Sequence, residues 1–331
     1  MSLRIGYACI NTELRGYDVF TSRGLILATV ASKGMEYIHE LIRKNVDDLM
    51  KILIFNEAHG IRFYRISSCV FPHLGNPAIG TDYNYNLDFI RPQLKLIGSY
   101  ALAHGHRLTM HPGQFVQLGS PDKEIVRRSI DDLSNHARLL KMLGYKPENG
   151  SVLIIHGGGT YGDRTQTLMR WRENFLNMPI EIRNLIALEN DENAYGIMDL
   201  LPICEELMIP FCLDIFHNRV SKRRVAITVT LMERIKATWT RNKPPKIHVS
   251  EQQPNLRRGA HSATLNELPL YVLRLPTILK TDIDIMLEVK DKEVSVLKMY
   301  YKYFTVHQDE QGRIDYKLKP EFTRKNLTID E

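Results

Sequence analysis

Cysteine is scarce in this chain of 331 residues, which contains four. No two of them have the spacing of a CxxC motif, so the sequence offers neither a cysteine-bound zinc site nor a dithiol redox motif. Three of the four lie within or beside apolar runs, where buried free thiols are expected. The four are Cys9, Cys69, Cys204 and Cys212.

Long apolar runs are missing as well. No stretch of about 18 apolar residues occurs, and the N-terminal MSLRIGYACI lacks the basic-then-apolar pattern of a signal peptide. We therefore expect a protein that does not span a membrane and that stays in the cytoplasm. No Gly-rich linker, repeat or low-complexity tract divides the chain. With 44% hydrophobic and 25% charged residues, it is predicted to form one globular domain with a large core.

Short β-rich segments alternate with amphipathic helical segments along the chain. The expected strands begin at Arg4, Ile61, Arg107, Ser151, Leu185, Phe211, Lys246 and Asp284. Helical spacing covers residues 37–59, 86–104, 124–143, 165–177, 197–208, 221–240 and 292–304. Eight such units predict an α/β fold, most simply a single-domain (β/α)8 TIM barrel over residues 1–304, with a doubly wound open sheet as the alternative. Residues 305–331 are expected to form a peripheral charged tail.

Nearly every expected strand ends in a residue type that binds metal ions. Such strand ends meet at the active-site face of a TIM barrel. A single histidine there is more often a satisfied core residue, but six such ends are hard to explain independently. Histidines and carboxylates without cysteine suit Mn²⁺, Zn²⁺, Fe²⁺ or Co²⁺, and eight candidates are too many for one ion. We predict a multinuclear centre of the kind that hydrolyses phosphate esters. The candidates are His111, His156, Glu189, Asp214, His217, His248, His261 and Glu288.

Two local features leave alternatives open. In FCLDIFHN, Asp214 and His217 stand three positions apart, as a pair of ligands or as a helix N-cap followed by a core histidine. Lys246 stands two residues before His248, so strand alternation points both side chains at the same interior. An ammonium group beside divalent cations is repelled. Lys246 therefore either pairs elsewhere, or is neutral, or carries a carboxylate added by CO₂ that bridges metals.

The loops HPGQFVQLGSP and HGGGTYGDR follow two of these histidines. The three glycines of the second loop can admit a phosphate, but no P-loop Lys-Ser/Thr follows them. Gln114 and Phe115 suit stacking on bases or wedging them apart, with ordinary loop packing as the alternative. The net charge of +6 raises the expectation of a polyanionic partner only modestly. Basic clusters occur at residues 127–128, 222–224, 241–243 and 257–258, and those that follow strand ends are favoured as contacts to a DNA backbone. These are Lys222, Arg223 and Arg224, and Arg257 and Arg258.

With these residues in view, the sequence resembles the UV damage endonuclease family over roughly residues 4–304. The resemblance rests on GYACIN, RISS, HPGQF, LENDE, DIFHN, PKIHVSEQ and IMLEVKDKE, in that order. It implies a TIM-barrel DNA repair nuclease, related to the endonuclease IV type of apurinic-site nuclease. The implied activity is incision of double-stranded DNA immediately 5′ to cyclobutane pyrimidine dimers and 6-4 photoproducts, and by extension at abasic sites, leaving a 3′-hydroxyl.

The resemblance also implies roles for individual residues. The eight candidates above become ligands of up to three divalent ions, with Mn²⁺ the usual metal and Zn²⁺, Co²⁺ or Mg²⁺ as alternatives. Lys246 takes the place of a family lysine that can be carboxylated. The implied catalytic residues are Glu189, Lys246, His248 and Tyr7, and the implied lesion-binding residues are Gln114, Phe115, Tyr7 and Asn11. Phe115 departs from relatives that carry tyrosine there, and His73 is expected near the metals. A monomer is the simplest expectation.

Two other functions are compatible with polar residues at barrel strand ends. A metal-dependent sugar isomerase or epimerase would have a small polar pocket and no affinity for DNA. A DNA-binding protein with structural metals would cut nothing, although structural sites usually need only four ligands. Salt-dependent binding to duplex DNA separates the sugar enzyme from the other two, and strand incision separates those from each other.

Overall fold

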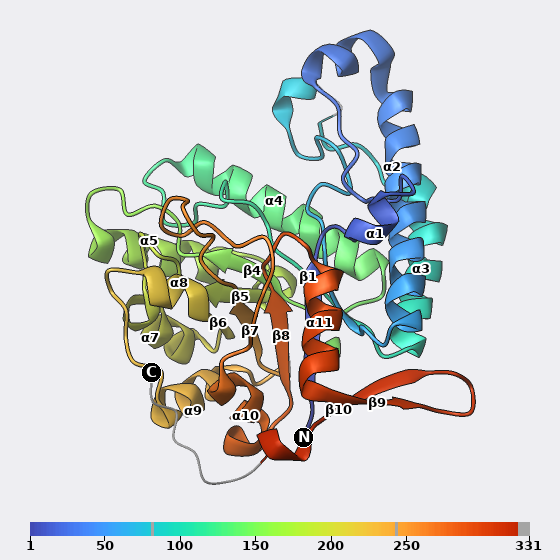
Figure 1. Cartoon of the computed structure of the whole chain (residues 1–331). Helices are drawn as coiled ribbons and strands as arrows, with labels where there is room; N and C mark the ends of the chain where they lie inside the picture. The colour runs from blue at the N-terminus through green and yellow to red at the C-terminus, as the bar shows by residue number, and fades with distance from the viewer. Residues whose placement is uncertain (81–82, 242–243, 324–331) are drawn as a thin grey trace.

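The computed structural model describes residues 1–80, 83–241 and 244–323. Its centre is a closed barrel of eight parallel strands in chain order, with β1 beside β8 (Figure 1). The strands are β1 (Leu3–Ala8), β2 (Phe63–Ile66), β3 (Arg107–Met110), β4 (Leu153–His156), β5 (Ile186–Glu189), β6 (Phe211–Asp214), β7 (Lys246–Val249) and β8 (Ile283–Leu287). The predicted single-domain TIM barrel is confirmed, and the open-sheet alternative is wrong. Residues 242–243 of one basic cluster and 324–331 of the expected tail lie outside the described residues.

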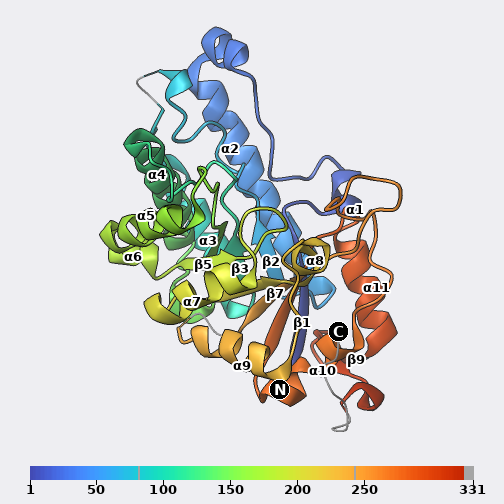
Figure 2. The same cartoon turned by 90° about the vertical axis from the view of Figure 1, so that its left-hand side faces the viewer.

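Helices follow the strands and surround the barrel (Figures 1 and 2). They are α1 (Thr12–Arg15), α2 (Leu27–Ala58), α3 (Arg91–Ala103), α4 (Lys123–Met142), α5 (Arg164–Asn177), α6 (Ile180–Arg183), α7 (Ile197–Leu207), α8 (Ile215–Val220), α9 (Val229–Thr238), α10 (Leu270–Leu279) and α11 (Glu293–Tyr303). Apolar side chains of strands and helices pack into one large core cluster. No helix in the described part of the chain is both long and apolar enough to cross a bilayer.

Helix α2 is longer than its periodicity predicted. Gly34, with φ 72° and ψ −174°, breaks the helical backbone, so that a first segment from Leu27 joins the expected helix at an angle. A positive φ of this kind is accessible to glycine at little cost. The N-terminal part of α2 rises beyond the end of the barrel toward which β8 points (Figure 1).

Other departures from the expected elements have local causes. The helix expected over residues 221–240 begins at Val229, and the short α8 precedes it. Helix α10 was missed because its sequence, LYVLRLPTIL, is apolar on most sides and contains Pro276, so it lacks a polar face. The expected tail contains two antiparallel strands, β9 (Phe304–Gln308) and β10 (Ile314–Leu318). This hairpin packs on α11 through stacked rings of Tyr300 and Tyr316, whose centroids are 3.9 Å apart.

Strand alternation sets which side chains reach the inside of the barrel. In β1, Ala8 lies in a small interior cluster with Phe63 and Met286. A side chain at Gly6 would stand 2.1 Å from the Phe63 carbonyl oxygen, so only glycine fits there. Tyr7, between these two positions, points out of the barrel toward α2, where its hydroxyl donates to Asn56 Oδ1 at 2.6 Å.

Candidate metal centre

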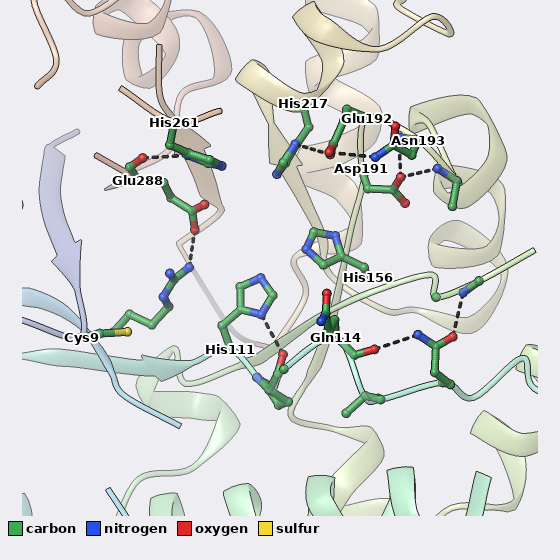
Figure 3. Close-up of a pocket in the computed structure, with 18 residues that line it drawn as sticks. Cys9, His111, Gln114, His156, Asp191, Glu192, Asn193, His217, His261 and Glu288 are labelled. Atoms are coloured by element: carbon green, nitrogen blue, oxygen red, sulfur yellow. Dashed lines mark hydrogen bonds and ion pairs between the residues drawn. The ribbon is translucent and has the colours of Figure 1, made fainter. Parts of the chain in front are cut away.

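A cavity of about 620 Å³ opens where the carboxyl ends of the strands meet. Figure 3 shows histidines and carboxylates from several strand ends pointing into it. Parallel strands of a closed barrel deliver their last residues to the same face, which is why positions far apart in the chain converge here.

All eight candidate ligands come together at this face. They form four overlapping groups of three, and in each group the ligand atoms lie within 4.8 Å of one another. Sharing of members between groups is the arrangement expected of several neighbouring ions rather than one. The groups are His111, His156 and Glu189; Glu189, Asp214 and His217; Asp214, His248 and Glu288; and His217, His261 and Glu288.

Glu189 lies at the centre of the cluster and is fully buried. One of its oxygens is 3.0 Å from His111 Nε2, and the other is 2.7 Å from His248 Nδ1. Burial alone would raise the pKa of this carboxyl, but the surrounding histidines lower it well below its ordinary value. Burial also lowers the pKa of His248 to about 4. Glu189 is thus ionised and His248 neutral near pH 7, which are the forms that bind metal ions.

Asp214 caps a helix with one of its carboxylate oxygens and directs the other toward the cluster. One carboxylate oxygen accepts the His217 backbone N–H at 2.6 Å and caps α8. The other, Oδ2, is buried without a hydrogen-bond partner and lies 3.6 Å from His217 Nε2. Burial raises the pKa of Asp214 well above its ordinary value. The helix cap therefore explains the position of one carboxylate oxygen of Asp214 but not that of the other.

Four buried side-chain atoms of the candidate ligands lack a hydrogen-bond partner among the described residues: His156 Nδ1, Asp214 Oδ2, His217 Nδ1 and His248 Nε2. His217 Nδ1 faces Glu192, and the ring nitrogens that face Glu189 are His156 Nε2 and His248 Nδ1. Asp214 Oδ2 is therefore the unpartnered atom that faces the cluster, 3.6 Å from His217 Nε2 and 3.9 Å from His248 Nδ1. Burying such an oxygen unpaired costs about 1–3 kcal/mol or more, and a divalent cation would satisfy it. The donor set of imidazole nitrogens and carboxylate oxygens fits Mn²⁺, Zn²⁺, Co²⁺ or Fe²⁺, so these residues suit such ions.

An outer contact determines which ring nitrogen of His261 is free to bind a metal ion. His261 Nδ1 lies 2.8 Å from the Glu288 carbonyl oxygen, which only accepts, so Nδ1 carries the proton and donates it. Nε2 is then the nitrogen left for a metal ion, the arrangement that outer contacts impose on metal-binding histidines. His111 has acceptors on both sides, because its Nδ1 lies 3.0 Å from the Pro112 carbonyl oxygen and its Nε2 lies 3.0 Å from Glu189 Oε2.

Sequence reasoning missed Glu192, although it belongs to the quoted LENDE motif three residues after Glu189. Its Oε2 lies 2.8 Å from His217 Nδ1. Contact with His217 is the main reason that the pKa of Glu192 falls to about 2. Although burial opposes it, Asp214 and Glu192 raise the pKa of His217 to about 10. Glu192 thus holds the His217 ring through Nδ1, while Nε2 faces Asp214 (Figure 3).

Arg65 was also missed, although it is the arginine of the quoted RISS motif. It lines the cavity, and its guanidinium forms an ion pair with Glu288. The two side chains are only 14% and 13% exposed. Burial would lower the pKa of Arg65, but Glu288 raises it, so the arginine stays charged beside the ligands. From the sequence alone, Arg65 could be recognised only as a residue within the second expected strand.

The turn after β3 presents Gln114 and Phe115. Both line cavities at this face, and Phe115 is 82% exposed. Gln117 holds the turn, because its Nε2 donates to the Gln114 carbonyl at 2.8 Å while its Oε1 accepts from Gly159 N at 2.7 Å. Gln114 and Phe115 are therefore accessible, and their contact with a lesion stays a prediction.

Tyr7 and Asn11 are placed differently from what a direct contact with DNA requires. Both are fully buried, and Asn11 Nδ2 donates to the Tyr7 hydroxyl at 3.0 Å. Asn11 also caps α1 by accepting from Leu14 N. Neither side chain lines the cavity. Tyr7 faces α2 because it alternates with the inward-facing positions of β1. In this conformation neither side chain can contact DNA. A catalytic or lesion-binding contact by either residue stays a prediction, and it requires the segment that carries them to move.

Two further predicted residues also lie outside the lining of the cavity. Lys246 is fully buried in the barrel below His248, and its Nζ donates to Thr109 Oγ1 at 3.3 Å. No carboxylate of the described residues lies within ion-pair distance of it, and burial lowers its pKa to about 7. His73 belongs to none of the ligand groups found in the described chain. Its ring nitrogens face the Leu25 carbonyl and Asn76, which corrects the expectation that it approaches the metals.

The basic clusters are exposed. Arg223 forms an ion pair with Asp199 of α7 at 2.7 Å. Arg257 and Arg258 lie at the tip of a loop closed by a bridge between Gln252 and His261. Surface charge of this kind is available to a DNA backbone, but exposure alone does not establish such a contact.

A family model described as UV-endonuclease UvdE matches residues 3–317. The chain belongs to the UvdE family. The resemblance read from the motifs is thereby confirmed, over a span that also includes the hairpin of β9 and β10. The members of this family are named as endonucleases for UV damage.

Individual relatives agree with this membership. A protein of Acanthamoeba polyphaga mimivirus named "Putative UV-damage endonuclease" is 60% identical over 324 residues, covering 98% of both chains. The UV-damage endonuclease of Schizosaccharomyces pombe is 35% identical over 314 residues, which are 91% of this chain but 50% of that one. The chain thus spans about half the length of this fungal relative. The crystal structure of SacUVDE superposes with a TM-score of 0.77 at 30% identity, covering 89% of this chain and 96% of that one.

Proposed function

We propose that this protein is a metal-dependent DNA repair endonuclease that incises the backbone immediately 5′ to UV photoproducts, and also at abasic sites. The observation that carries the proposal is the convergence of eight histidine and carboxylate side chains at one cavity, with the buried Asp214 Oδ2 unpartnered among them. Membership of the UvdE family supports the DNA substrate. A sugar isomerase, the main alternative, has no such support from the family.

The ion-holding residues would be the eight members of the four groups. Bound divalent ions activate water and stabilise the attacking and leaving oxygens of a phosphodiester during hydrolysis. With the ions bound, Glu189, Asp214 and Glu288 would contribute three negative charges, which leaves room for net positive charge beside a phosphate. Arg65 adds a fixed cation at the rim of the same cavity and holds one oxygen of Glu288.

Gln114 and Phe115 are proposed to read damage by shape. A lesion that weakens stacking and pairing lowers the cost of kinking the duplex and displacing nucleotides, which is a few kcal/mol. An exposed aromatic ring and an amide on a braced turn can fill the gap left by displaced bases. Chemically different photoproducts, such as cyclobutane dimers and 6-4 photoproducts, then share one reader.

Lys246 is proposed to act from below the cluster, as a neutral or carboxylated side chain, because its burial disfavours the ammonium form. Its distance from the cavity lining means that a carboxylate added to Nζ would be needed for it to reach an ion. The exposed arginines Arg257 and Arg258, with residues 222–224, are proposed to contact the DNA backbone.

The experiment that tests the proposal is incision of an end-labelled duplex with one thymine dimer. It is run with Mn²⁺, with EDTA and with Glu189→Gln, beside undamaged DNA and beside Glu206→Gln, a carboxylate of α7 that pairs with Arg172. A metal-dependent cut 5′ to the dimer, abolished in Glu189→Gln and retained in Glu206→Gln, is expected. Absence of any cut with every metal would refute the proposal and favour a small-molecule substrate.

A further inference from the structure

The segment between β7 and α10 carries a candidate metal ligand and two arginines on one short hairpin. The bridge between Gln252 and His261 closes this hairpin, residues 252–261, which we call the finger. His261 stands at its base and lines the cavity of the metal centre. Arg257 and Arg258 are exposed at its tip. Within the described part of the chain neither arginine forms an ion pair, so both charges are available to a partner.

The Gln252 side chain crosses the finger and holds its two sides together. Its Oε1 accepts from Gly259 N at 2.9 Å, and its Nε2 donates to the Arg257 carbonyl oxygen at 3.0 Å. Nε2 also donates to the Gln253 carbonyl oxygen at 3.0 Å. All three hydrogen bonds end on backbone atoms. One side chain therefore sets the path of the main chain that carries Arg257 and Arg258.

At its base the finger is joined to the metal centre at two points. His261 Nδ1 donates to the Glu288 carbonyl oxygen at 2.8 Å, which leaves Nε2 for a metal ion. The second point is Gly259, whose φ is 85°. A β-carbon there would stand 3.3 Å from Oε1 of Glu192, the residue that holds His217. The finger thus contains one member of the group His217, His261 and Glu288 and packs behind another.

We propose that Gln252 is a positioning residue that links contact with the DNA backbone to ion binding at the metal centre. The inference rests on the proposed function, which supplies both the DNA and the ions. Because the Gln252 bonds join the tip of the finger to its base, their loss acts at both ends. Arg257 and Arg258 lose a fixed position for contacts with phosphates, and the His261 ring loses the support that a ligand needs from its surroundings.

The test compares the wild type with Gln252→Met, which keeps the length of the side chain but loses its hydrogen bonds. Gln308→Met is the matched control, since Gln308 Nε2 donates to the Gly312 carbonyl at 3.1 Å in the hairpin of β9 and β10. Gly259→Ala is a second variant, which strains the same finger through its positive φ. Thermal melting monitored by circular dichroism checks that the variants fold, and Gly259→Ala decides if Gln252→Met does not.

Two properties are measured. Mn²⁺ binding is measured by calorimetry without DNA. Binding of an undamaged duplex is measured in EDTA over a range of salt concentrations, because the slope of log affinity against log salt reports the number of phosphate contacts.

Gln252→Met and Gly259→Ala are expected to bind Mn²⁺ about 2- to 10-fold more weakly and to reduce the salt slope by about one, whereas Gln308→Met matches the wild type. Arg257→Gln combined with Arg258→Gln should reduce the slope by about two and leave the Mn²⁺ affinity unchanged. Added to Gln252→Met, the same pair should reduce the slope by only about one more, because substitutions within one structural unit are not additive.

A Gln252→Met protein with the Mn²⁺ affinity or the salt slope of the wild type would overturn the inference, because the finger would then not link the two properties. Incision of the thymine-dimer duplex by the wild type with Mn²⁺, measured in parallel, reports on the proposed function separately. If the wild type cuts the dimer and Gln252→Met keeps either property, the link alone is refuted. If the wild type does not cut and Gln252→Met loses both properties, the proposed incision alone is refuted.

Discussion

Replacing Glu192 with glutamine tests whether the contact behind His217 prepares the metal centre. The substitution keeps the size and an amide oxygen but removes the charge that faces His217 Nδ1 at 2.8 Å. We expect the ring to lose its preferred orientation and its protonated Nδ1, so that Nε2 becomes a poorer ligand.

The magnitude is set by the pKa of Glu192, which falls from 4.5 to about 2 mainly because of His217. At about 1.4 kcal/mol for each factor of ten, this corresponds to roughly 3 kcal/mol of interaction. The Glu192 side chain is 25% exposed, so solvent screening reduces the figure to roughly 1–2 kcal/mol. Metal affinity is therefore expected to weaken about tenfold, at the lower end of the 10–100-fold range seen for such outer contacts.

The assay is a Mn²⁺ titration of the wild type and Glu192→Gln, with incision of a thymine-dimer duplex and calorimetric metal binding as two readouts. Glu206→Gln serves as the matched control. The variant should require about ten times more Mn²⁺ and regain most of its activity at saturation. A Mn²⁺ dependence of Glu192→Gln identical to that of the control would refute the reasoning.

Three further predictions concern other residues of this face. Gln114→Ala combined with Phe115→Ala should reduce selectivity for damaged over intact DNA while bound metal content, measured by atomic emission, stays constant; unchanged selectivity removes both from the lesion reader. Arg65→Met should destabilise the metal-free protein by about 3–5 kcal/mol, because the buried Glu288 loses its arginine ion-pair partner, and Mn²⁺ should raise the melting temperature more in the variant than in the wild type. Lys246 has a pKa of about 7, so the fraction in its neutral amine form, which attacks the carbon of CO₂ and releases a proton to give the carbamate, grows as the pH rises through 7. Bicarbonate should therefore stimulate incision more at pH 8 than at pH 6, and not at all in Lys246→Arg, whose guanidinium stays protonated.

The linear pattern was sufficient for the barrel and for the identity of the candidate ligands. Strands that end in His156, Glu189 or Asp214 can be recognised one at a time, and the rule that parallel strands share a carboxyl-terminal face then brings them together. The same local rule failed for α10, whose apolar and proline-containing sequence has no amphipathic pattern, and for the hairpin of β9 and β10, which is held by contacts with α11.

Residue types and their spacing by themselves determined the fold class and the set of eight candidate ligands, because these depend on strand periodicity and on the residue types at or shortly after the strand ends. The resemblance to the family rested on the order of seven short motifs. Only the tertiary structure decided which polar groups stand behind those ligands. Glu192 and Arg65 were recognisable as charged residues, but their partners are distant in the chain or depend on how a loop folds. Tyr7 faces α2, away from the cavity, because it alternates along β1 with Gly6 and Ala8, which face the inside of the barrel.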